Sequence, residues 1–167
     1  LVTLPQAQVA NTNNAAVIAQ KAPENQVLTL KNRSEILAET QNLRVEIKTN
    51  SLHGSIFLRG ARLDDLTLAN YFETQKKEKE VVLFSPAESK ERYFTDFGFL
   101  SANSDIELPN PDTIWKADNK LLSEKTPVTL SFTNKQNITF QIKISLDENY
   151  MFAVTQSVKN NSGKEIS

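Results

Sequence analysis

The last third of the chain alternates apolar and polar residues over three consecutive segments. Residues 134–137 and 147–149 separate these segments and have the composition of turns. Because successive side chains of a strand point to opposite faces, this period of two predicts a three-stranded antiparallel meander with one apolar face. The alternating apolar positions are Val128, Leu130, Phe132, Ile138, Phe140, Ile142, Ile144, Leu146, Tyr150, Phe152, Val154 and Val158.

The same period occurs earlier in the chain and predicts three further strands. Val45 and Ile47 mark the first strand, residues 56–58 the second and residues 66–68 the third. Gly60 interrupts the pattern, and a glycine there permits the positive φ of a tight turn, so we expect a hairpin.

Three other segments have distinct local patterns. Asn32 is a candidate N-cap for a short helix over residues 33–39. Residues 81–84 predict a short buried strand, ended by a proline that cannot donate to a sheet. Residues 102–119 are rich in Asn, Asp and Pro and are expected to form mostly loop.

These elements predict a mainly β fold. A chain with almost no helix can cover the apolar face of one sheet only with another sheet, so we expect an antiparallel β-sandwich with one short N-terminal helix. Residues 1–20 carry no charge and are dominated by small and amide residues. We therefore expect a flexible linker over residues 1–26 and the sandwich domain over residues 27–167.

Composition argues against a nucleic-acid partner, cysteine chemistry and a membrane span. The formal net charge is -1, which argues against nucleic acid as a partner. The absence of cysteine excludes disulfides and thiolate chemistry. No stretch approaches the roughly 18 consecutive apolar residues of a membrane span, so this piece is expected to be soluble.

No catalytic, cofactor-binding or metal-binding residue is predicted. The only histidine, His53, is placed in a turn over residues 50–54, and it has no cysteine or second histidine to share a metal. Residues Asp112, Asp118 and Asn119 lack the spacing of a calcium loop. Four glycines are too few for a phosphate-binding loop.

Three pairs of carboxylates are candidates for acid–base chemistry. Asp64 and Asp65 are neighbours on a predicted strand, so they should point to opposite faces unless a bulge intervenes. The other pairs are Asp105 with Glu107, and Asp147 with Glu148. We expect these residues to be structural, and therefore predict that the chain is not an enzyme.

Aromatic residues leave two interpretations open. Trp115 and the cluster of Tyr93, Phe94, Phe97 and Phe99 could line a groove for a peptide or a sugar, or could pack in the core. Core packing is the commoner arrangement and is the one we expect.

Six segments together resemble the first periplasmic domain of YidC proteins from Gram-negative bacteria. They are GSIFLRGARLDDLTLANYFET from Gly54, VVLFSPAES, YFTDFGF, PNPDTIWKAD, TPVTLSF and DENYMFAVTQSVKN. The resemblance covers most of the chain after residue 26. It lies in the pattern of residues along the strands and in the residues of the turns. It contains no catalytic signature.

The resemblance implies a β-supersandwich in the periplasm, within a protein of the inner membrane. Members of this family insert and fold inner-membrane proteins, alone or with the Sec translocon, so translocon components and nascent membrane proteins are the implied partners. Their insertion chemistry lies in a membrane bundle, so no functional residue is carried onto this chain. A carbohydrate-binding or mutarotase-like sandwich is the alternative, and a chaperone-like peptide binder overlaps with the first interpretation.

The chain departs from the family in length. Periplasmic domains of this family are usually longer, and the chain stops after the turn at residues 160–163. The domain is therefore expected to be incomplete at its C-terminal end. An unpaired sheet edge there could support dimers.

Overall fold

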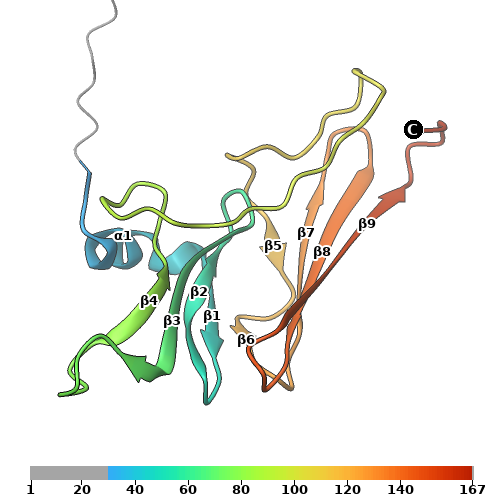
Figure 1. Ribbon diagram of the computed structural model, residues 1–167. Helices are drawn as coiled ribbons and strands as arrows, with labels where there is room; N and C mark the ends of the chain where they lie inside the picture. Colours follow the sequence, from blue (N-terminus) through green and yellow to red (C-terminus); the bar gives the residue numbers. More distant parts are fainter. Residues whose placement is uncertain (1–29, 167) are drawn as a thin grey trace, which may run out of the picture.

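The computed structural model describes residues 30–166, which form two β-sheets and one short helix (Figure 1). The expected linker over residues 1–26 lies outside the described residues, so the domain boundaries remain a prediction. The predicted mainly β sandwich is confirmed.

The first sheet has the strand order β4-β3-β2-β1-β6. Its strands are β1 (Arg44–Lys48), β2 (Leu52–Phe57), β3 (Arg62–Phe72), β4 (Glu80–Phe84) and β6 (Leu121–Leu122). Neighbours pair antiparallel except β1 with β6, which pair in parallel. The predicted hairpin joins β2 to β3, where Gly60 and Ala61 both have positive φ values, of 74° and 52°.

The second sheet has the order β5-β7-β8-β9 and is antiparallel throughout. Its strands are β5 (Lys116–Ala117), β7 (Val128–Thr133), β8 (Ile138–Leu146) and β9 (Phe152–Asn160). The three long strands are the predicted meander.

One apolar cluster fills the space between the two sheets. Val45, Ile47 and Ile56 of the first sheet and Leu130 and Ile142 of the second are each at most 1% exposed. All five alternating apolar residues of β8 are buried, as the period of two predicts.

A long connection between β4 and β5 crosses one end of the sandwich (Figure 1). Phe97 and Phe99 of this connection pack against the core, and Phe99 contacts Trp115 with ring centroids 6.2 Å apart. Core packing is therefore the correct interpretation for these three aromatic residues. Tyr93 is 68% exposed, and Phe94 lies against Arg62, whose guanidinium carbon is 5.3 Å from the ring centroid. Neither residue belongs to the core cluster, so core packing is not the correct interpretation for these two.

The helix α1 (Arg33–Thr40) follows Asn32 and continues into a 3-10 turn, η1 (Gln41–Leu43). The predicted helix is confirmed, and the backbone N–H of Asn32 donates to the Glu35 carboxylate at 3.0 Å. Only Ile36 of the helix is buried, so apolar packing alone holds α1 weakly. Within residues 30–166 no helix is long and apolar enough to cross a membrane.

Two local predictions were wrong. The turn between β1 and β2 comprises residues 49–51, so His53 lies within β2, opposite Lys48 and Thr67. The segment predicted as a buried strand is β4, which has one free edge because it lies at the margin of the first sheet. Its residues are only partly buried, and Leu83 is exposed.

Candidate functional site

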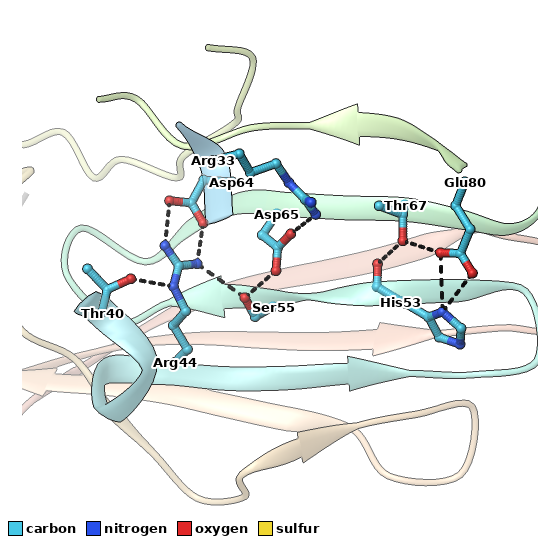
Figure 2. Close-up of polar contacts among 9 residues, drawn as sticks. All are labelled: Arg33, Thr40, Arg44, His53, Ser55, Asp64, Asp65, Thr67 and Glu80. Atoms are coloured by element: carbon cyan, nitrogen blue, oxygen red, sulfur yellow. Dashed lines mark hydrogen bonds and ion pairs between the residues drawn. The ribbon is translucent and has the colours of Figure 1, made fainter. Parts of the chain in front are cut away.

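A polar cluster lies on the outer face of the first sheet, beneath α1 (Figure 2). Because Val45 and Ile47 of β1 point into the core, the side chain of Arg44, the first residue of β1, lies on the outer face with the cluster. The strand register places Ser55 of β2 and Asp65 of β3 directly opposite each other. The outer face therefore collects charged and hydroxyl groups, whereas the inner face is apolar.

A β-bulge brings both adjacent aspartates into this cluster. The register of β2 with β3 passes from Ser55 opposite Asp65 to Ile56 opposite Leu63, which leaves Asp64 as the extra residue. At Gly54, a Cβ atom would stand 2.1 Å from the Asp65 carbonyl oxygen, so the close approach of the two strands requires glycine. The bulge that the sequence analysis required for both aspartates to share one face is therefore present.

Arg44 is the centre of the cluster. Its guanidinium donates to the two carboxylate oxygens of Asp64, at 2.6 and 3.2 Å, and its Nε donates to Thr40 Oγ1 of α1 at 2.7 Å. The same group lies 4.8 Å from the ring centroid of Phe57. The Arg44 side chain is 6% exposed and that of Asp64 1%, so this ion pair is buried.

Ser55 connects this ion pair to a second one. Its hydroxyl accepts from Arg44 Nη1 at 3.2 Å and donates to Asp65 Oδ2 at 2.6 Å. The other oxygen of Asp65 accepts from Arg33, at the start of α1. Arg33 and Thr40 therefore tie both ends of the helix to the sheet. We call the six residues Arg33, Thr40, Arg44, Ser55, Asp64 and Asp65 the ionic cluster.

Burial affects the protonation of Asp64. Desolvation raises the pKa of Asp64 above its ordinary value, and the hydrogen bond and charge of Arg44 oppose that rise. The carboxylate oxygens of both aspartates already have partners within the protein. This arrangement connects α1 to the sheet through the contacts of Arg33 and Thr40.

A pocket of about 520 Å³ lies beside the ionic cluster, between α1 and the segment that follows β4. Its apolar lining includes Ile36, Leu43 and Phe57. Thr40 and Phe57 belong to this lining and also contact Arg44, so the ionic cluster stands directly behind the pocket. The sequence patterns predict neither the pocket nor the role of Arg44 in the ionic cluster. The one signal available for the cluster was Gly54, an isolated glycine within a strand.

The remaining candidates are dispersed over the surface. His53 Nδ1 lies 3.4 Å from Glu80, which also accepts from Thr67 at 3.0 Å, at the other end of the same face (Figure 2). The Asp105 and Glu107 segment contacts Gln136 through backbone groups, and Asp147 organises the β8–β9 turn. Among residues 30–166, no three acidic or histidine side chains are grouped so as to hold a metal ion.

Known proteins resemble this chain over most of its length. A model of the YidC periplasmic domain family matches residues 44–167. A membrane protein insertase YidC of Allorhizobium ampelinum is 41% identical over 158 residues, which cover 93% of this chain and 25% of that protein. One from Rickettsia canadensis is 43% identical over 140 residues, covering 82% and 25%. Another, from Rickettsia rickettsii, is 44% identical over 129 residues, covering 77% and 23%. The chain thus spans about a quarter of the length of the curated relatives it matches.

Proposed function

Since the chain belongs to the family of YidC periplasmic domains, we propose that it serves a membrane protein insertase, assisting the insertion and folding of inner-membrane proteins. The observation that carries this proposal is the family match, which begins at β1 and includes both sheets. The insertase acts alone or together with the Sec translocon. It lies on the periplasmic side of the inner membrane, as the family name implies.

The proposed role is not enzymatic. The carboxylates of Asp64 and Asp65 already bind Arg44, Ser55 and Arg33, and a proton taken up by Asp64 would weaken its buried ion pair with Arg44. The relatives from Allorhizobium ampelinum and Rickettsia canadensis are named as membrane protein insertases, and their names mention no sugar. A binding role for client segments or for the translocon therefore suits this domain better than a carbohydrate-directed reaction.

We also propose that the edge strands β4 and β9 differ in their capacity to accept a further strand. The edge strand β4 has five residues and an irregular register, and residue Ser85 just beyond it already pairs with Tyr93. Strand β9 pairs with β8 over nine residues without a register shift. Such a long regular edge favours strand addition, by a second chain or by a client segment.

Site-specific photocrosslinking in cells tests the proposed function. A photoreactive residue is placed in the full-length insertase at exposed positions of this domain, for example at Tyr93 on one face and Lys135 on a distant turn. The proposal predicts crosslinks to nascent inner-membrane proteins or to translocon subunits from at least one face. Its failure would be the absence of such crosslinks from every exposed position, while a crosslinker in the membrane-embedded part still captures clients.

A further inference from the structure

The pocket beside α1 combines an apolar floor with a charged rim. Its volume of about 520 Å³ lies in the range of sites that hold part of a peptide or a small molecule. Leu30, Ile36, Leu43 and Phe57 supply apolar surface from the helix, from the segments on either side of it and from β2. The rim carries Lys31, Arg59 and Arg92 together with Glu39 and Glu88.

The charges on this rim do not balance one another. Lys31 Nζ pairs with Glu39 at 2.6 Å, and Glu88 lies 3.8 Å from Arg62. The guanidinium groups of Arg59 and Arg92 form no ion pair or side-chain hydrogen bond within the described part of the chain. Two arginines without partners beside an apolar floor favour a ligand that carries both an apolar group and a carboxylate.

The wall of the pocket is held in position before any ligand arrives. Arg33 and Thr40 connect α1 to Asp65 and Arg44 on the sheet. Phe57 lies on the floor with the Arg44 guanidinium against its ring. A site whose wall is fixed in this way loses less entropy on binding than one that must fold around its ligand.

We propose that this pocket binds an extended polypeptide segment in which bulky apolar residues are followed by acidic ones. The apolar side chain occupies the floor, and the acidic side chains pair with Arg59 and Arg92. Ends of membrane segments that face away from the cytoplasm are poor in Lys and Arg, so apolar residues with acidic flanks are admissible there. This inference rests on the proposed function and specifies the class of client segment.

An anionic lipid surface fits the same pocket less well. A bilayer would present a continuous layer of negative charge to the whole rim, including Glu39 and Glu88. A peptide carries only one or two carboxylates and can direct them to the arginines alone. The chain as a whole has a net charge of -1, which gives no general attraction to anionic lipid.

Peptide binding to the purified 167-residue chain tests the inference. The probe is a fluorescent 12-residue peptide with a Leu-Phe-Leu core followed by two aspartates, and fluorescence anisotropy measures its affinity. The double variant R59Q/R92Q is expected to weaken binding by at least about tenfold, because two charge-assisted contacts are lost. The matched variant K135Q/K143Q removes two exposed charges outside the pocket lining and should bind as the parent does.

Two further comparisons separate the possible causes. The variant A87F fills the pocket from its lining and should abolish binding, and a peptide with lysines in place of the aspartates should bind at least tenfold more weakly. Equal affinity of R59Q/R92Q and the parent would overturn the inference. So would binding to phosphatidylglycerol vesicles combined with no binding to the peptide.

The photocrosslinking experiment distinguishes failure of this inference from failure of the proposed function. Client crosslinks that persist unchanged in a full-length R59Q/R92Q insertase would contradict the pocket and leave the insertase role standing. Loss of client crosslinks near the pocket, with crosslinks elsewhere retained, is the expected result.

Discussion

The two sheets of this domain are stabilised in different ways. The second sheet depends on apolar burial, since the alternating residues of β8 face the core along its whole length. The first sheet has a similar inner face, but its outer face holds two ion pairs between charged side chains that are largely removed from water. Alternating apolar and polar residues are sufficient to form a sheet. The helix on the first sheet is instead positioned by charged side chains.

The largest expected effect is loss of the Arg44 charge. Arg44→Met leaves the Asp64 carboxylate buried without its cation, so the free energy of unfolding should fall by about 3–5 kcal/mol. Urea denaturation measures this change. Lys79→Met, which removes an exposed partner of Glu73, is the control and should change stability by less than about 1 kcal/mol. Equal effects of the two variants would show that the Arg44 pair is not buried in solution.

A similar loss is expected from a cavity in the second sheet. Ile142 is fully buried, and Ile142→Ala should lower the free energy of unfolding by about 2–4 kcal/mol. Val154 points to the same face from the neighbouring strand β9, paired with Ile144, but it is 37% exposed. Val154→Ala should therefore cost less than about 1 kcal/mol. A larger loss at Val154 than at Ile142 would contradict the described burial of the second sheet.

Release of the helix should have a smaller and more local effect. Arg33→Gln removes the contact of α1 with Asp65, and should lower global stability by about 1–2 kcal/mol. Hydrogen exchange should accelerate in α1 and remain unchanged in β8, since the two elements belong to different parts of the domain. Uniform acceleration over both elements would indicate that the helix does not open separately.

The smallest effect concerns pH. Because the pKa of Asp64 is raised in the folded protein, the native state binds this proton more tightly than the unfolded chain does. The stability contributed by this group is fully present below its ordinary pKa of 3.8 and is lost as pH rises through the folded value. The stability of the parent relative to Asp64→Asn should therefore fall as pH rises from 3.8. Glu148→Gln, in an exposed turn, controls for the loss of one negative charge, and a difference that rises with pH would contradict the assigned direction.

Most of the fold could be predicted from the sequence, because the alternation of apolar and polar residues along a strand indicates which side chains are buried. The meander, the β2–β3 hairpin and the helix after Asn32 all follow from local patterns. The ionic cluster could not be predicted, because a bulge shifts the side chains on one side of it relative to the other. Arg44 and Asp64 are also 20 positions apart, and no local rule pairs them. The prediction of a turn at His53 was wrong because three residues are enough to connect β1 with β2, and His53 therefore lies within β2.

The pocket depended on contacts that are still more distant in sequence. Its lining comes from α1, from the end of β2 and from the segment after β4, which meet only in the folded chain. Arg59 and Arg92 resemble ordinary surface residues in the sequence. Their significance arises from the apolar floor beside them and from the lack of a partner within residues 30–166.

A double-mutant cycle on Arg44 and Asp64 tests most directly whether a buried ion pair organises the face that carries α1. The free energy of unfolding is measured for the parent, Arg44→Met, Asp64→Leu and the double variant. The described structure predicts that the double variant is more stable than Arg44→Met, with a coupling of at least about 2 kcal/mol, because no charge is then left unpaired. Additive effects of the two substitutions would contradict the account.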